Sequence, residues 1–187
     1  MSDVRMSALP GAAADGTVSV REMGLQGMVS LRCDLAAAGD AVRSVTGAAM
    51  PGPLEITTGE GTRVAWMSPD EILVLCDHDR ADALCAGLSG VLASTHHLAV
   101  NVSDARAIFA VEGPRGPLRD TLAKITPADI GALAPGEMRR TRLQQVAAAI
   151  WFESETEARV ICFRSVAQYV FDLLAISARD GGEVGYH

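Results

Sequence analysis

The stretch from Leu98 to Lys124 constrains the fold of this chain more than any other part of its sequence. Val100 and Val102 alternate with polar residues, which is the period of a β-strand. A second apolar strand is predicted over residues 107–112, and Ser103-Asp104 between the two strands forms a turn, because such side chains bond the nearby backbone. The stretch therefore begins as two short strands joined by a tight polar turn.

A Gly-Pro elbow follows the second strand and ends it. The elbow reads G-P-R-G-P over residues 113–117, and proline lacks the N–H that a sheet ladder needs. Pro117 fits the first turn of a helix, and apolar residues at helical spacing predict that helix over 117–125. Glycines before a helix can also cradle an anion, but the elbow lacks both the P-loop and the dinucleotide-binding patterns. We therefore interpret it as structural.

The composition favours a folded chain with an acidic surface. Of the 187 residues, 49% are hydrophobic and 21% are charged, which permits a full core. The net charge of −7 argues against nucleic-acid binding, because an acidic surface repels phosphates. The one basic run, Arg139-Arg140-Thr141-Arg142, is short and is interpreted as a solvated strand end.

The cysteines favour a reducing compartment. Cys33, Cys76 and Cys162 lie within apolar strand patterns, where a thiol behaves as a small hydrophobe. A metal site of Cys76, His78 and Cys85 would need a fourth ligand that the sequence does not supply, so we predict no metal ligands. The N-terminus has no uninterrupted apolar segment, and no apolar run approaches ~20 residues. We therefore predict a cytoplasmic protein with no membrane contact.

The predicted elements follow one order twice, β-α-β-β-α. The first half has a strand at 28–33, a helix at 35–45, a hairpin at 62–76 and a helix at 81–92, and the second has the same elements at 107–112, 117–125, 141–163 and 165–177. Each half is most of a split βαβ, or ferredoxin-like, unit. The predicted class is α+β, with two antiparallel sheets and helices on one face of each.

The expected organisation is a flexible N-terminal arm (1–17), a first half (18–97), a second half (98–178) and a loose tail (179–187). Thr141 to Phe152 is predicted to be one long strand. Asp34 and Ser165 are predicted to cap the helices that follow them. Tyr169 is placed in the apolar stripe of the last helix, together with Val166, Val170, Leu173 and Leu174.

Several residues invite a catalytic or binding interpretation. Ser103, Asp104 and His96 or His97 have the side chains of a hydrolytic triad, but Ser103 lies in no nucleophile elbow and a turn explains it better. Trp66 and Trp151 lie among apolar strand neighbours, which favours core or interface packing. Arg164 has a carboxylate as its candidate partner. We therefore predict no catalytic, cofactor-binding or metal-binding residues in this chain.

Four segments resemble the gamma subunit of heterotetrameric sarcosine oxidase. They are L-Q-G-M-V-S-L-R-C-D (25–34), V-A-W-M-S-P-D-E-I-L-V-L (64–75), V-N-V-S-D-A-R-A-I-F-A-V-E-G-P (100–114) and F-R-S-V-A-Q-Y-V-F-D-L-L (163–174). They occur in the family's order and cover most of residues 25–175. A wider resemblance, through V-S-D-x-R-A and the Gly-Pro elbow, is to the folate-binding aminomethyltransferase (T-protein) fold.

The resemblance implies a non-catalytic subunit that docks on the alpha, beta and delta subunits of a complex. That complex oxidatively demethylates sarcosine to glycine, forms hydrogen peroxide, and releases methylenetetrahydrofolate when tetrahydrofolate is present. FAD, FMN, NAD and tetrahydrofolate are expected in the partner subunits and none in this chain. Two alternatives stay open: a free-standing folate-binding one-carbon protein with Asp104 as its carboxylate, and a small regulatory ligand-binding module.

Overall fold

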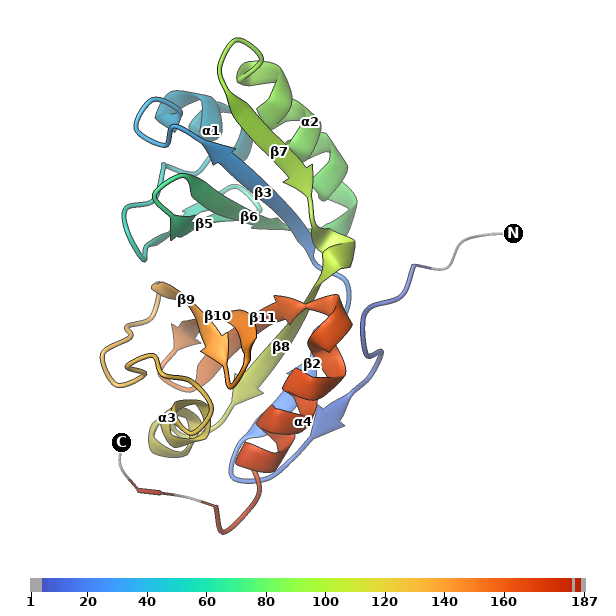
Figure 1. The fold of residues 1–187 in the computed structure, drawn as a ribbon, viewed down its shortest axis with the longest axis vertical. Coiled ribbons are helices and arrows are strands. Elements are labelled where there is room, and N and C mark those ends of the chain that lie inside the picture. The colour runs from blue at the N-terminus through green and yellow to red at the C-terminus, as the bar shows by residue number, and fades with distance from the viewer. Residues whose placement is uncertain (1–4, 183, 186–187) are drawn as a thin grey trace. The chain divides into compact units, whose positions relative to one another are not determined.

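The computed structural model describes residues 5–182, 184 and 185, and the chain divides into two compact units. The inserted unit comprises residues 26–103, and the terminal unit comprises the described parts of 1–25 and 104–187. Each unit contains one antiparallel sheet with helices on one of its faces (Figure 1). We describe each unit by itself.

The inserted unit has a five-stranded sheet in the order β4-β5-β6-β3-β7. Its strands are β3 (Gly27–Cys33), β4 (Ile56–Gly59), β5 (Thr62–Ser68), β6 (Glu71–Cys76) and β7 (His97–Asn101). Its helices are α1 (Gly39–Thr46), the 3-10 turn η1 (His78–Arg80) and α2 (Ala81–Val91). Aliphatic residues such as Leu31, Val74 and Leu88 form the core between the sheet and these helices.

The terminal unit has a six-stranded sheet in the order β1-β2-β8-β11-β10-β9. Its strands are β1 (Ala13–Ala14), β2 (Ser19–Glu22), β8 (Arg106–Glu112), β9 (Met138–Leu143), β10 (Val146–Ser154) and β11 (Glu157–Phe163). Its helices are α3 (Arg115–Ala123) and α4 (Ala167–Ser177), with 3-10 turns η2 (Ser103–Ala105) and η3 (Arg164–Val166) before β8 and α4. Phe109, Phe152 and Leu122 belong to its core.

The two sheets follow the same strand order over five positions. From β4 to β7, the inserted sheet corresponds strand by strand to β9-β10-β11-β8-β2 of the terminal sheet. The strand β7 therefore occupies the position in its sheet that β2 occupies in the other. This arrangement confirms the predicted α+β class with two antiparallel sheets. The inserted sheet has two strands more than a β-α-β-β-α half, and the terminal sheet has three more.

The unit boundaries differ from the predicted halves. Val18 and the strand β2 lie in the terminal unit, because β2 pairs with β8 rather than with the strands that follow it in sequence. Residues 98–103 remain with the inserted unit, because β7 pairs with β3. Of the predicted arm, residues 1–4 lie outside the described residues, and Ala13–Ala14 pair with β2. In the predicted tail, positions 183, 186 and 187 lie outside the described residues as well.

The prediction of a single strand from Thr141 to Phe152 is wrong. The chain turns back between β9 and β10, which pair with each other from Leu143 and Val146 outward. Gln144 makes this turn with a φ of 50°, a left-handed conformation that glycine or asparagine adopts more readily. The sequence L-Q-Q-V carries neither residue, so the hairpin has no sequence signal.

Two predicted helix caps are also wrong. The Asp34 carboxylate accepts a hydrogen bond from the Ala36 N–H at 3.0 Å, but this closes a turn, and α1 begins only at Gly39. Ser165 lies inside η3, and the capping position of α4 is Val166, which has no side-chain cap bond. By contrast, Gly47 ends α1 with a φ of 72°, as expected for a left-handed helix end.

Candidate functional site

The residues with triad chemistry are engaged in separate local contacts. Ser103 is buried, and its hydroxyl donates to Asn101 Oδ1 at 2.6 Å and accepts from the Met28 N–H at 2.9 Å. The Nδ1 atom of His97 lies 3.0 Å from the Thr95 carbonyl oxygen. The Ser103 hydroxyl therefore fixes the end of β7 against the start of β3, which is the structural role that the turn interpretation gives it.

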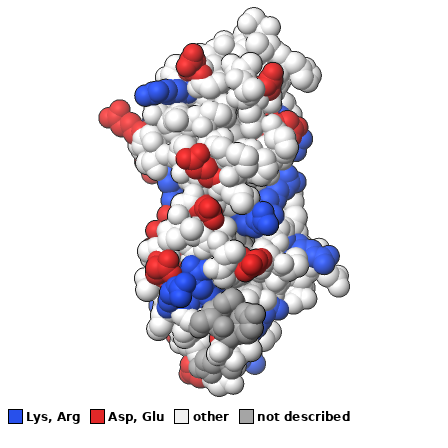
Figure 2. Space-filling view, turned by 90° about the vertical axis from the view of Figure 1, so that its left-hand side faces the viewer, with Lys and Arg blue, Asp and Glu red and all other residues white. Residues whose placement is uncertain are grey.

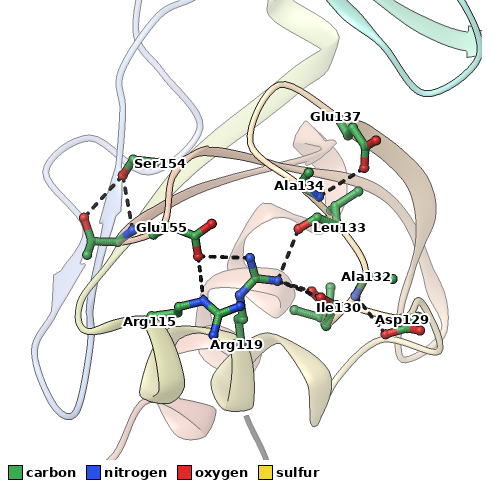
Figure 3. A network of polar contacts seen from close by, with 12 residues as sticks. Arg115, Arg119, Asp129, Ile130, Ala132, Leu133, Ala134, Glu137, Ser154 and Glu155 are labelled. Carbon is green, nitrogen blue, oxygen red and sulfur yellow. Dashed lines mark hydrogen bonds and ion pairs between the residues drawn. The ribbon is translucent and has the colours of Figure 1, made fainter.

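The Gly-Pro elbow is a point of close packing. A Cβ on Gly113 would lie 2.6 Å from the Val18 Cγ1 atom, so only glycine fits there. Pro114 occupies the capping position of α3 with a φ of −58°. The side chain of Arg115 in the first turn of α3 binds Glu155, with 2.7 Å between Nε and Oε2 (Figure 3). A carboxylate of the chain itself thus lies beside this helix start.

Arg119, which the sequence analysis did not single out, is a buried guanidinium that anchors a loop. Its Nη1 donates to the carbonyl oxygens of Ile130 and of Leu133, the latter at 3.2 Å (Figure 3). Its guanidinium carbon lies 4.5 Å from the centre of the Phe152 ring, within cation–π distance. In the sequence, Arg119 directly follows Leu118 and precedes Leu122 by three residues, which indicates only that it lies beside the apolar side of α3.

Glu155 connects Arg119 to the surface. Its Oε2 lies 3.4 Å from Arg119 Nη2 and also accepts the bond from Arg115. The hydrogen bond from Arg115, with that from Arg119, lowers the pKa of the Glu155 carboxyl below its usual value of 4.5. These polar contacts hold the 130–133 loop and the β10–β11 turn in place, which is a structural role.

The cysteines are unreactive or only partly accessible. Burial raises the pKa of the Cys162 thiol to about 12, and burial also raises the pKa of Cys76 and, together with the Asp34 charge, that of Cys33. All four cysteines are free thiols. Among residues 5–182, 184 and 185, no group of three His, Cys, Asp or Glu side chains is arranged to hold a metal ion.

The remaining candidates have structural contacts. Trp151 is fully buried, and its indole N–H donates to Glu153 at 3.0 Å, while Trp66 is half-buried. Arg164 binds backbone rather than the expected carboxylate: its Nη2 donates to the carbonyl oxygens of Met6 and Ser7, at 2.9 and 3.0 Å. This bond ties the segment before β1 to the start of α4.

Charges of both signs are interspersed on the surface. Figure 2 shows Lys and Arg next to Asp and Glu across the face it presents. The arginines of the basic run, at positions 139, 140 and 142, are all exposed, as predicted, but they lie along β9 rather than at the end of a strand. In the described part of the chain, no helix is both long and apolar enough to span a membrane.

Exposed apolar side chains are the remaining candidate for function, and two elements, β7 and α4, each carry two large ones, whereas α2 and β11 carry one each, Val91 and Phe163. On β7, Leu98 is 56% exposed and Val100 is 40% exposed. On α4, Tyr169 is 42% exposed and Ile176 is 57% exposed. The two residues are about two helical turns apart and therefore lie on the same side of the helix. The placement of Tyr169 in the buried stripe is therefore wrong. Apolar side chains that a folded chain leaves in water, when they cluster, are typical of protein contact surfaces.

The fold is that of a larger class of proteins. The glycine cleavage system aminomethyltransferase T from Bartonella henselae superposes with a TM-score of 0.66 and 11% identity, covering 89% of this chain and 48% of that one. No family model matches the chain. The chain thus shares the fold of about half of this aminomethyltransferase, and this likeness concerns the fold alone.

Within this class, the chain is a homologue of sarcosine oxidase gamma subunits. The gamma subunit from Corynebacterium sp. strain U-96 is 27% identical over 179 residues (92% of this chain, 85% of the relative), and that from strain P-1 is 30% identical over 132 residues (69% and 63%). A chain of the heterotetrameric sarcosine oxidase from Corynebacterium sp. U-96 superposes with a TM-score of 0.78 and 25% identity, covering 89% of this chain and 87% of that one. The predicted resemblance is confirmed.

Proposed function

We propose that this chain is the gamma subunit of a heterotetrameric sarcosine oxidase and has no active site of its own. The observation that carries the proposal is the similarity in sequence to a gamma subunit, and in fold to a chain of a heterotetrameric sarcosine oxidase, over about nine tenths of this chain. In the complex, sarcosine is oxidised to glycine, O2 is reduced to hydrogen peroxide, and the methyl carbon leaves as methylenetetrahydrofolate when tetrahydrofolate is present. The complex acts in the cytoplasm.

The cofactors FAD, FMN, NAD and tetrahydrofolate belong, in this proposal, to the alpha, beta and delta subunits. Support comes from the polar side chains of this chain, which hold its own backbone. Ser103 joins two strands, Arg119 holds a loop, and Arg164 binds the segment before β1. These side chains make hydrogen bonds within the chain itself, which suits a subunit that binds its partners but does not catalyse the reaction.

Co-expression tests this proposal. The chain is tagged and produced together with the other subunits encoded beside it, and the purified material is assayed for flavin absorbance and for hydrogen peroxide formed from sarcosine. We expect one coloured, peroxide-forming complex that contains the tagged chain. Recovery of the tagged chain alone, with full activity in the untagged fraction, would refute the proposal.

The fold likeness to an aminomethyltransferase supports one alternative, a free-standing folate-binding protein. In that case the isolated chain binds tetrahydrofolate, and Asp104 is the candidate carboxylate for the pterin ring. Isothermal titration calorimetry of the chain with tetrahydrofolate distinguishes the two functions. The subunit proposal expects no heat of binding from the chain by itself.

A further inference from the structure

The strand β7 forms an open edge of the inserted sheet. It pairs with β3 on one side, and in the described part of the chain no strand lies on its other side (Figure 1). Leu98 and Val100 point to the sheet face away from the helices, since Ala99 between them packs against the helix-covered core. The edge therefore combines unpaired backbone with two exposed apolar side chains.

The register shows which backbone groups of β7 point outward. The Val102 N–H donates to the Met28 carbonyl at 2.8 Å, and hydrogen-bonded pairs alternate along an antiparallel ladder. Val100 and Leu98 are therefore bonded to β3, as partners of Ser30 and Arg32. It follows that the N–H and C=O groups of the intervening residues, His97, Ala99 and Asn101, face away from the sheet.

The corresponding strand β2 shows how the same edge is used in the terminal sheet. There the Met23 N–H donates to the Ile108 carbonyl on the inner side, so Val20 and Glu22 face outward by the same alternation. The strand β1 takes this outward side: the Glu22 N–H donates to the Ala12 carbonyl at 2.9 Å, and Ala14 pairs with Val20. An added strand thus completes the terminal sheet at the position where the inserted sheet ends.

The other sheet edges have features that discourage strand addition. The strand β9 carries exposed arginines at positions 139, 140 and 142, β4 has only four residues and two polar threonines, and β1 has only two residues. Charged side chains and short length are the usual protections of an edge. The strand β7, with the sequence H-L-A-V-N, contains no Lys, Arg or Pro, and its pairing with β3 shows no bulge.

We propose that an extended segment of a partner subunit adds as a strand to the outer edge of β7. The segment bonds the outward backbone groups of His97, Ala99 and Asn101, and places apolar side chains over Leu98 and Val100. This inference rests on the proposed function, in which the chain assembles with different subunits. A second copy of this chain is the less suitable occupant, because two chains of net charge −7 repel each other.

Amide hydrogen exchange tests the added strand directly. It is measured at single-residue resolution on the assembled complex and on the isolated chain. We expect exchange at His97, Ala99 and Asn101 to slow by about tenfold or more in the complex, because these amides gain partners. The amides of Leu98 and Val100 are bonded to β3 in both states and serve as internal controls.

Proline substitutions test the same bonds through assembly. Ala99→Pro removes an outward N–H and leaves the ladder with β3 intact, so the isolated variant is expected to fold. Thr58→Pro is the matched control on β4, the opposite edge of the same sheet. The Thr58 N–H also faces outward. The Trp66 N–H donates to the Glu55 carbonyl, so the next hydrogen-bonded pair along the ladder is Thr57 with Val64, and the groups of Thr58 point away from β5. We expect Ala99→Pro to weaken recovery of the partner subunits about tenfold, and Thr58→Pro to leave it unchanged.

A side-chain variant keeps the test decisive if Ala99→Pro fails to fold. Leu98→Lys adds one charge at a residue that is 56% exposed, and Ile176→Lys adds the same charge on α4 at 57% exposure. We expect only Leu98→Lys to reduce assembly about tenfold. Equal losses in both variants would show that no single edge drives docking, and would overturn the inference.

The outcomes also separate this inference from the proposed function. An active wild-type complex with unchanged exchange at His97, Ala99 and Asn101 overturns the strand addition and leaves the subunit function intact. Failure of the wild-type chain to assemble at all refutes the proposed function, and the inference with it. Protection of the same amides in the isolated chain, rising with its concentration, would assign the edge to a second copy and contradict a partner subunit.

Discussion

The two units share a strand order, but they hold their corresponding connections with different chemistry. In the inserted unit, the connection from α1 to β4 is held by neutral hydroxyl groups: Thr62 donates to the Thr46 carbonyl and Thr57 to the Ala49 carbonyl, each at 2.5 Å. In the terminal unit, the connection from α3 to β9 is held by the buried Arg119 guanidinium. The same strand order is thus stabilised in two different ways. Removing the charged group should lower the free energy of unfolding more than removing a neutral hydroxyl group.

The largest expected effect is the loss of Arg119. Arg119→Met keeps most of the side-chain volume but leaves the Ile130 and Leu133 carbonyl oxygens buried without a donor, so we expect the free energy of unfolding to fall by about 2–4 kcal/mol. Thr62→Val removes one neutral donor from the corresponding connection, and its expected cost is about 1 kcal/mol. Urea denaturation of both variants measures the difference.

Arg115→Ala is the control for this prediction. Arg115 belongs to the same network but its side chain is 61% exposed, and exposed ion pairs contribute about 1 kcal/mol or less. If Arg119→Met costs no more than Arg115→Ala, the buried guanidinium does not anchor the loop. The contrast between the two units would then disappear.

The second prediction concerns the corresponding strands β2 and β7, of which only β2 is covered by a further strand, β1. The Glu22 N–H donates to the Ala12 carbonyl, and hydrogen-bonded pairs alternate along the ladder. The Ala14 N–H therefore points toward β2, whereas the Ala13 N–H points to solvent. Ala14→Pro should therefore detach β1, lower the free energy of unfolding by about 1–2 kcal/mol, and open the β2 edge. Ala13→Pro is the matched control, with a smaller expected loss. Thermal unfolding and amide exchange at Val20 report on the two changes.

A third prediction concerns the hairpins that lie at corresponding places in the two sheets. The turn between β4 and β5 places Gly61 at a φ of 68°, a conformation that glycine adopts readily, whereas the corresponding turn between β9 and β10 places Gln144 at a φ of 50°. Gln144→Gly relieves this left-handed backbone, and we expect a gain of about 0.5–1 kcal/mol in the free energy of unfolding. Gly61→Ala should have the opposite sign, because it introduces a Cβ at a positive φ. A loss of stability in Gln144→Gly would contradict the turn conformation.

These sites show which features of the fold the sequence could predict. Period-two patterns and helical spacing predicted most strands and all four helices, because burial of one face repeats with the backbone geometry. The hairpin at Gln144 could not be predicted, because tertiary pairing of β9 with β10 overrides a local preference. Ser165 and Asp34 resemble caps, but 3-10 and turn conformations precede α4 and α1 and displace them.

The candidate surface was harder to predict than the fold. Residues 98–100 have the alternation of a half-buried strand. This pattern indicates that one face of the strand is covered, but it does not identify the segment that covers it. Whether the outer edge is bare depends on the partner strand, and the pairing of β1 with β2 rather than with β7 joins segments of the terminal unit. The role of Arg119 likewise depends on a loop eleven residues or more away along the chain.

The smallest expected effect is the pH dependence of the Glu155 contacts. The hydroxyl bonds of Thr57 and Thr62 in the inserted unit involve no titrating group and have no such dependence. The pKa of Glu155 is lowered chiefly by its hydrogen bond from Arg115, so the folded state favours the charged carboxylate. A lowered pKa adds stability that is fully present above the usual value of 4.5 and is lost as the pH falls through the folded value. We expect an NMR titration to place the pKa of Glu155 below 4.5, and Arg115→Ala to return it toward that value. An unchanged pKa in Arg115→Ala would show that Arg119 alone holds the carboxylate, and would shift the whole electrostatic contribution to the buried guanidinium.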